Sequence, residues 1–430
     1  MPILFPQKLF VRSRALLALA AVVGLGLSGC ENKSTTPGDS SKPSGGSAST
    51  QDPVKVGVMG PYSGGSSPMG LSMRDGVRLA AEEINNAGGV LGGRKIELVE
   101  RDDQATNERG AQVIQDLLNS QKVCAVLGPI NTGVAQASYR YPQEAKVPYI
   151  LNVTTGAWVN EHFKEYPDNY VFGLRANDNQ QSELIAKEAI DKRGYKKVAI
   201  LADETNYGQN GRALLEDALK KRSVTPVYIG KFKIKDTDMT PQLQEARNNG
   251  AEAVLTYGIG PELAQIANGM EKLGWKVPIV GSWTLSMSNF IDAAGGNGNG
   301  AVMPQTFIQD KPPTPTGQQF VQNYVKKYNP ANGRIPSPVS AAQGYDSMKI
   351  LAEAINEAGS DDPKKLKTAL ENLQKPVEGA IAIYTKPFSA DNHEAIKTEE
   401  INIGKVQDGH VVMETPAASS GGGANKPTGS

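Results

Sequence analysis

VPYILNVTT at residues 147–155 and VCAVLGPINTG at residues 123–133 are two stretches of the same design. Each is a short apolar strand that ends in small polar residues, Thr154–Thr155 in the first and Asn131–Thr132 in the second. Neighbouring parallel strands would bring these groups together at the carboxyl edge of a sheet, where open α/β sheets bind ligands. Such donors suit an anionic or strongly polar group. The alternative is that they only cap helices, but the pair together favours a binding site.

Segments typical of strands and helices alternate on both sides of these stretches. A strand begins at Val54, a helix with apolar residues at helical spacing ends at Gly88–Gly89, and a strand covers Ile96–Glu100. A second alternating set begins with a strand at Tyr170–Leu174 and runs to about Ser282. This alternation predicts an α/β fold with doubly wound, mostly parallel sheets. The body of roughly 360 residues is long enough for two domains.

Several local motifs occur together in a familiar order. They are VGVMGPYSGGSSPMG from Val56, the helix–turn–strand segment GVRLAAEEINNAGGVLGGRKIELVERDD from Gly76, the two stretches quoted first, and DETNYGQNG from Asp203. The chain thereby resembles the type I periplasmic solute-binding proteins of ABC importers, the branched-chain amino-acid-binding (leucine-binding-like) family, in its lipoprotein form. The resemblance covers nearly all of residues 54–414.

The resemblance implies two doubly wound parallel-sheet lobes joined by three crossovers, with the ligand in the cleft between them. On this chain the first lobe would be residues 53–172 and 305–376. The second lobe would be residues 173–304 and 377–415. The helix near Pro338–Ala358 would thus return to the first lobe.

The same resemblance implies a set of ligand-binding residues. The residues that follow the two strands would hold the carboxylate of the ligand, Met69 would cover it, and tyrosines of the second lobe would close over it. The expected residues are Met69, Asn131, Thr132, Val153, Thr154, Thr155, Tyr207, Tyr257 and Trp283.

One position departs from the family. Amino-acid binders of this family use a carboxylate near the end of a second-lobe strand to bind the ammonium group, but Gly281–Trp283 contains no acid. A buried ammonium without a charged partner costs several kcal/mol. Asp203 or Glu204 is a candidate for the missing charge, and Trp283 offers a cation–π or stacking face. The ligand therefore stays open between an amino acid, an aromatic acid, an amide and another small carboxylate.

The two ends of the chain differ from the body. Residues 1–30 have a basic start, an apolar run from Ala15 to Leu27, and the sequence Leu-Ser-Gly-Cys ending at Cys30, which resembles a bacterial lipobox. Residues 31–52 read as a flexible tether and residues 416–430 as a disordered tail, because both have almost no apolar residues. We expect a protein anchored to a membrane through lipid on Cys30, in the periplasm of a bacterium.

Composition argues against other classes of protein. Lys+Arg and Asp+Glu both number 45, so charge gives no case for nucleic-acid binding. There are three histidines and two cysteines, Cys124 lies in an apolar strand, and no catalytic or phosphate-loop motif is present. We expect a monomer that is not an enzyme, with no cofactor and no metal. Its partners would be a small ligand and ABC permease subunits, and a ligand-sensing receptor of the same fold is the alternative function.

Overall fold

The computed structural model describes residues 52–414. The expected export signal, the lipidation cysteine Cys30, nearly all of the tether and the C-terminal tail lie outside the described residues. Within residues 52–414, no helix is both long enough and apolar enough to cross a bilayer.

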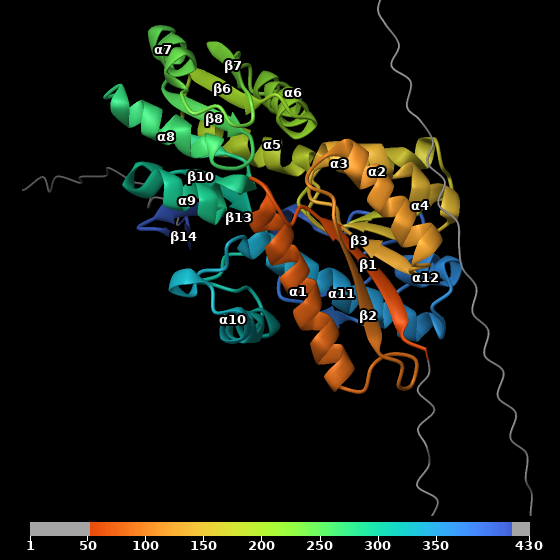
Figure 1. Cartoon of the computed structure of the whole chain (residues 1–430). Helices are drawn as coiled ribbons and strands as arrows, with labels where there is room; N and C mark the ends of the chain where they lie inside the picture. Colours follow the sequence, from red (N-terminus) through yellow and green to blue (C-terminus); the bar gives the residue numbers. More distant parts are fainter. Residues whose placement is uncertain (1–51, 415–430) are drawn as a thin grey trace, which may run out of the picture. The chain divides into compact units, whose positions relative to one another are not determined.

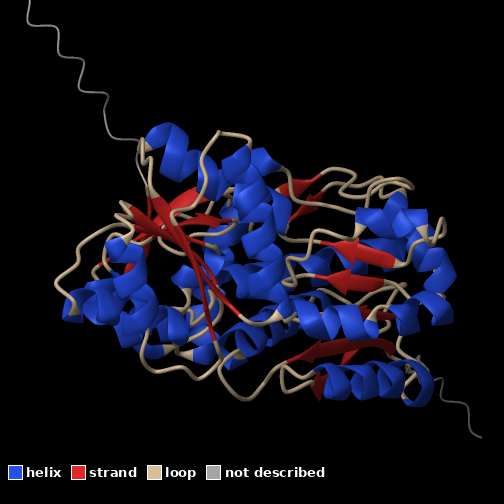
Figure 2. Cartoon of the chain, turned by 90° about the horizontal axis from the view of Figure 1, so that it is seen from above, coloured by secondary structure: helices blue, strands red, loops and turns tan. Residues whose placement is uncertain are grey.

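A five-stranded sheet with the order β2-β1-β3-β4-β5 organises the first set of elements, and all its neighbouring strands are parallel. Helices cover both faces (Figures 1 and 2). Strands β3, β4 and β5 are accordingly apolar and buried along their whole length, whereas the edge strand β2 carries charged residues. Val56 and Val58 pack in the core that contains α1 and α11 residues, whereas Met59 and Val126 pack on the opposite face with α2 and α3. The bounds are β1 Val54–Gly60, α1 Ser67–Asn86, β2 Ile96–Asp102, α2 Asn107–Gln115, β3 Ala125–Leu127, α3 Thr132–Ser138, α4 Arg140–Ala145, β4 Tyr149–Leu151, β5 Val171–Gly173, α10 Pro315–Tyr328, α11 Pro338–Ala358 and α12 Pro363–Glu371.

A seven-stranded sheet with the order β14-β13-β10-β9-β8-β6-β7 organises the second set. Its strands β6 to β10 run parallel to their neighbours, while β13 and β14 add an antiparallel edge. The bounds are α5 Asp178–Ala186, β6 Val198–Asp203, α6 Asn206–Lys220, β7 Tyr228–Phe232, α7 Thr240–Asn248, β8 Ala253–Tyr257, α8 Glu262–Lys272, β9 Ile279–Gly281, α9 Ser288–Ala294, β10 Val302–Gln305, β13 Asn402–Gln407 and β14 His410–Met413.

Short elements complete the described chain. The two-stranded hairpin is β11 Val377–Glu378 and β12 Ile383–Tyr384. Single turns of 3-10 or π-helix are η1 Asp116–Ser120, η2 Asn160–Lys164, η3 Lys187–Lys192, η4 Trp283–Ser286, η5 Gly295–Gly298, η6 Ala331–Gly333 and η7 Thr398–Glu400.

Local signals account for several helix ends. The Thr106 hydroxyl accepts a hydrogen bond from the backbone N–H of Arg109, as expected of a residue that caps α2. The Asn177 side chain accepts a hydrogen bond from the backbone N–H of Gln180, and the Gln180 side chain accepts one from the backbone N–H of Asn177, which forms a capping box at the start of α5. Helix α1 is followed by Gly89, whose φ of 83° is left-handed and costs glycine little.

The strand expected at Tyr170–Leu174 belongs to a different set from the one predicted. We assigned it to the start of the second set, but β5 pairs in parallel with β4 and is the edge strand of the first sheet. Strand pairing is decided by contacts far apart in sequence, and the chain leaves the first sheet only after this strand.

The boundary expected at Val377 is also too early. Asp346 in α11 accepts hydrogen bonds from the backbone N–H groups of Ala380 and Ile381 and from the Tyr384 hydroxyl. The backbone of Ala395 bonds to Gly173 in β5. Residues 377–396 therefore pack with the first set of elements, and the final passage to the second sheet follows Ala395.

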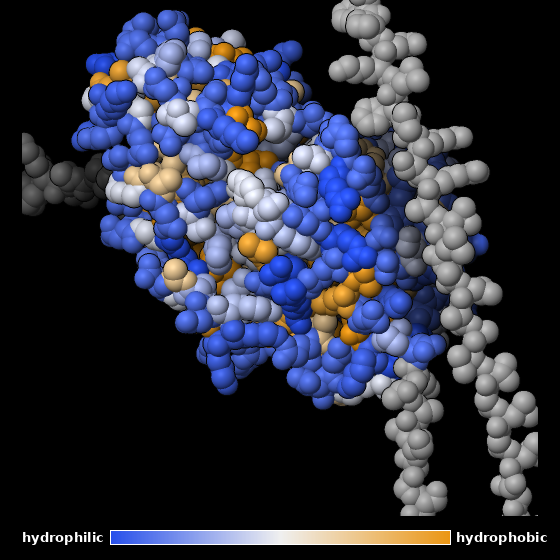
Figure 3. Space-filling model, viewed as in Figure 1, coloured by the Kyte–Doolittle hydropathy of each residue, from blue (hydrophilic) through white to orange (hydrophobic). Residues whose placement is uncertain are grey.

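The surface of the described chain is largely polar. Three large hydrophobic side chains within residues 52–414 are exposed by more than a third, namely Ile229, Ile234 and Ile383. Figure 3 shows a mostly hydrophilic face with small, scattered hydrophobic patches. This face carries no broad apolar area of the kind that permanent partners cover.

Candidate ligand-binding site

The two polar stretches lie side by side, as their sequence predicted. Strands β3 and β4 are adjacent and parallel, with Val126 opposite Tyr149 and Leu127 opposite Ile150. Asn131–Thr132 and Thr154–Thr155 therefore follow neighbouring strands at the same sheet edge. This edge is where the candidate site begins.

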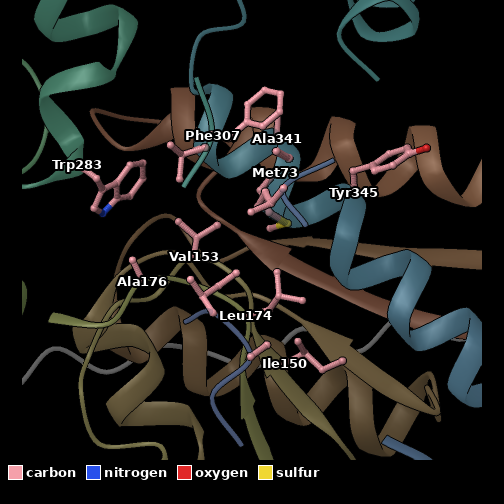
Figure 4. Close-up of a cluster of buried hydrophobic side chains, with 14 of the residues drawn as sticks. Met73, Ile150, Val153, Leu174, Ala176, Trp283, Phe307, Ala341 and Tyr345 are labelled. Atoms are coloured by element: carbon pink, nitrogen blue, oxygen red, sulfur yellow. The ribbon is translucent and has the colours of Figure 1, made fainter. Parts of the chain in front are cut away.

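Three of the expected site residues have structural roles. The Thr154 hydroxyl donates to the Pro129 carbonyl at 2.7 Å and so ties the two loops together. Val153 and Met69 are each 1% exposed and belong to the hydrophobic core. Figure 4 shows Val153 within this buried cluster.

Asn131 and Thr132 leave polar atoms free. Asn131 precedes α3, yet no capping hydrogen bond from its side chain occurs in the described structure, so capping does not explain this residue. Its Nδ2 donates to Ser66 Oγ at 3.2 Å. Asn131 Oδ1 and the Thr132 hydroxyl are buried without a partner in residues 52–414.

Asp178, the first residue of α5, is the central charged group. It is fully buried, and its backbone N–H donates to the Thr155 carbonyl at 2.8 Å. The Tyr257 hydroxyl donates to Oδ1 at 2.8 Å, while Oδ2 has no partner among the described residues. Burial raises the pKa of Asp178 to about 6, although the neighbouring hydroxyl groups of Tyr257 and Thr155 and the positive charge of Arg175 act to lower it. The carboxylate is therefore mainly ionised at neutral pH.

A buried guanidinium fixes the loop that faces this carboxylate. Arg175 is fully buried, and it donates from Nε to the Thr154 carbonyl at 2.7 Å and from Nη2 to the Gly156 carbonyl at 2.8 Å. It also pairs with Glu394. Burial lowers the pKa of Arg175 to about 10, so it stays charged at neutral pH. Arg175 thus sets the position of the threonine loop.

Two tyrosines and a tryptophan of the second set complete the arrangement. The rings of Tyr207 and Tyr257 lie 5.0 Å apart, and the Tyr207 hydroxyl is buried without a partner in residues 52–414. The backbone N–H of Trp283 donates to Gln181 Oε1 at 3.2 Å, and its carbonyl accepts from Gln305 Nε2 at 3.1 Å. Trp283 is 6% exposed and belongs to the buried cluster shown in Figure 4.

Neither residue named as the source of the missing charge supplies it. Both carboxylate oxygens of Asp203 are engaged, Oδ1 by Thr205 and Oδ2 by the backbone N–H of Ile259 at 3.0 Å. Glu204 is exposed. Asp203 therefore stabilises the turn between β6 and α6. The sequence analysis did not identify Asp178, because an aspartate at the start of a helix is also common where no ligand binds.

Several polar atoms of the site residues have no partner among residues 52–414. Buried polar groups in folded proteins almost always have partners, so these exceptions are candidate contacts for a polar ligand. Those near the site in the described structure belong to Asn131, Thr132, Asp178, Ser182, Tyr207, Thr256 and Trp283.

Two cavities divide the expected residues. A cavity of about 310 Å³ brings together Asn131, Thr132 and Tyr207, and its volume is in the range of small-ligand pockets. A much smaller pocket is lined by Thr155 and Trp283. Tyr257 lines neither cavity but bonds to Asp178. Residues 52–414 contain no cluster of side chains suited to holding a metal ion.

Comparisons with known proteins agree with this architecture. A family model described as "Periplasmic binding protein" matches residues 53–410. "Leu/Ile/Val-binding protein homolog 3" of Brucella melitensis is 25% identical over 360 residues, which cover 84% of this chain and 93% of that protein. "Amino acid binding protein" of Pseudomonas aeruginosa is 28% identical over 313 residues, which cover 73% of this chain and 80% of that protein.

A solved structure agrees at the level of fold. It is the branched-chain amino acid transporter substrate-binding protein LivJ of Streptococcus pneumoniae in complex with isoleucine. The TM-score is 0.74 at 26% identity, with 84% of this chain and 97% of that chain covered. The expected α/β fold of type I periplasmic binding proteins is confirmed.

Proposed function

Because this chain belongs to the periplasmic binding protein family, we propose that it captures an amino acid as the solute-binding component of an ABC importer. Its relatives are named as binding proteins, in agreement with the expectation that the chain is not an enzyme. The observation that carries the proposal is the free Oδ2 of buried Asp178 beside the threonine loops.

The ammonium group of the ligand would bind Asp178. A buried carboxylate with an unused oxygen is costly alone, and a cationic donor offsets that cost. The Asp178 side chain bonds directly to Tyr257, and its backbone N–H bonds to the Thr155 carbonyl, so Asp178 links the threonine loop to the second set of elements. A plain carboxylic acid would offer no donor to Asp178, and this favours an amino acid over an aromatic acid.

The carboxylate of the ligand would bind Thr132 and Thr155. The Thr132 hydroxyl is buried and lacks a partner within the described part of the chain. Hydrogen bonds to a charged acceptor contribute about 1.5–3 kcal/mol each. Trp283 would form a wall of the site, and Tyr207 would cover the ligand from the second set of elements.

The two sets of elements would act as lobes that close on the ligand. Hinge motion about connecting segments is common in proteins that enclose a solute. The contacts described above support connections after β5, after β10 and between Ala395 and β13. Small-angle scattering should show a lower radius of gyration at saturating ligand, and an unchanged radius would argue against closure.

Calorimetry tests the proposal most directly. The protein is titrated with amino acids, aromatic carboxylic acids and simple amides at pH 7.5. We expect at least one amino acid to bind, and its methyl ester and its N-acetyl derivative to bind far more weakly, because each removes one charge. Binding of aromatic acids in preference to every amino acid would overturn the assignment of Asp178.

The remaining part of the proposal concerns location. The lipobox-like sequence ending at Cys30 supports lipid anchoring on the outer side of a bacterial cytoplasmic or outer membrane. An anchor near the permease would keep the captured solute close to its transporter. Metabolic labelling with a fatty acid would detect the lipid on the wild-type protein.

A further inference from the structure

The cavity of about 310 Å³ has a polar lining. One side comes from the loops that follow β2 and β3, and the other from the start of α6 and from Ile259 after β8. Its apolar side chains are few, and hydroxyl and amide groups are in the majority. The polar lining residues are Thr106, Asn107, Glu108, Asn131, Thr132, Thr205, Asn206 and Tyr207.

Thr132 connects this cavity to the proposed head-group site. Its side chain is 1% exposed and lines the cavity, and the hydroxyl has no partner in residues 52–414. A ligand whose carboxylate reached Thr132 would therefore have its next atoms at the cavity. The cavity is large enough for a short side chain.

Asn131 gives the cavity a hydrogen-bond acceptor. Its Nδ2 donates to Ser66 Oγ at 3.2 Å, which orients the amide and leaves Oδ1 as a buried acceptor without a partner in the described structure. An aliphatic side chain placed here would leave that acceptor unsatisfied. A donor from the ligand would satisfy it.

The charges of the lining limit which ligand side chain the cavity can accept. Glu108 is the one residue of the described lining that carries a formal charge at neutral pH, and it is exposed at the rim. Lysine and arginine are absent from that lining, so an anionic side chain would find repulsion and no counter-charge. An uncharged side chain that donates hydrogen bonds suits the lining best.

Resting on the proposed function, we infer that this protein selects an α-amino acid whose side chain ends in a hydrogen-bond donor such as a carboxamide. Asn131 Oδ1 gives an advantage to a side chain that donates a hydrogen bond, and Glu108 disfavours an anionic side chain. The site thereby differs in preference from relatives that are named for leucine, isoleucine and valine.

Four probes test the inference on the full protein by calorimetry: alanine, glutamine, glutamate and leucine. Alanine reports on the head-group site alone. We expect glutamine to bind at least about tenfold more tightly than leucine or glutamate, as expected of a site that hydrogen-bonds its substrate. Leucine or glutamate binding as tightly as glutamine would overturn the inference.

Two variants assign the preference to residues. Asn131→Leu keeps the approximate shape and removes the acceptor, so glutamine should lose its advantage over leucine, and the ratio of the two affinities is the readout. Glu108→Gln should raise the affinity for glutamate alone. Asn248→Leu, an exposed position on α7, is the matched control and should change no ranking.

The outcomes distinguish a failure of the proposed function from a failure of the side-chain inference. If none of the four probes and no other amino acid binds, the proposed function fails. If alanine and leucine bind as well as glutamine and Asn131→Leu changes nothing, the function stands and the side-chain inference fails. The wild-type ranking decides the matter even if Asn131→Leu does not fold.

Discussion

Replacing Asp178 with asparagine is the sharpest test of the ligand site. The asparagine side chain would be nearly isosteric, and its Oδ1 could still accept the Tyr257 hydroxyl that lies 2.8 Å from the carboxylate in wild type. The free Oδ2, however, would be replaced by an NH2 group that faces the ammonium of the ligand. A charge-assisted hydrogen bond contributes about 1.5–3 kcal/mol, so affinity should fall roughly 10- to 150-fold.

The pH dependence of binding gives an independent signature. Burial raises the pKa of Asp178 to about 6 in the unliganded protein. Only the ionised carboxylate attracts an ammonium, so affinity should be constant above about pH 6. It should fall by about tenfold per pH unit below that value. The Asp178→Asn variant should lack this dependence.

The folding stability of the unliganded protein should depend on pH in the opposite direction from ligand affinity. Because the folded protein binds the Asp178 proton more tightly than the unfolded chain, stability decreases as pH rises from about 4 to 6. A pKa raised from 3.8 to about 6 corresponds to roughly 3 kcal/mol of destabilisation at neutral pH. The unliganded Asp178→Asn variant should therefore be as stable as wild type or more stable at pH 7.5.

Calorimetry between pH 5 and pH 8, with thermal unfolding alongside, measures both effects. Asp217→Asn is the matched control, because Asp217 is exposed on α6. Unchanged affinity and an unchanged pH profile in Asp178→Asn would refute the assignment of the ammonium to this residue.

Three further changes probe the rest of the proposal. Thr155→Val should weaken amino-acid binding by roughly 10- to 100-fold. Thr154→Val removes only the bond to Pro129, so it should lower the unfolding temperature and leave the side-chain preference intact. An equal loss of affinity in both variants would contradict this difference in roles. Trp283→Ala should alter the ranking of ligands by roughly tenfold, since the residue lines the pocket next to Thr155, and an unaltered ranking in competition titrations would remove Trp283 from the site. Cys30→Ser should yield a folded protein that no longer sediments with membranes, and continued sedimentation would exclude lipid anchoring at Cys30.

The sequence alone was sufficient to predict those helices and strands that depend on interactions between residues close together in the chain. The sequence predicted a strand from Val54, a helix that ends near Gly88–Gly89 and a strand at Ile96–Glu100, and these are β1, α1 and β2. Strands β3 and β4 were predicted from their apolar runs. These features depend on residues a few positions apart, whose periodicity and capping are visible in a single chain.

Tertiary structure decided the pairings between distant segments. It placed β5 in the first sheet and held residues 377–396 on α11 through Asp346. Both carboxylate oxygens of Asp203 accept hydrogen bonds near its own turn. Asp178 accepts a hydrogen bond on Oδ1 from Tyr257, which is 79 positions away in the sequence, and its other oxygen stays free. Which of two buried carboxylates keeps an unused oxygen depends on how strands from separate parts of the chain meet, and no local pattern in the sequence carries that information.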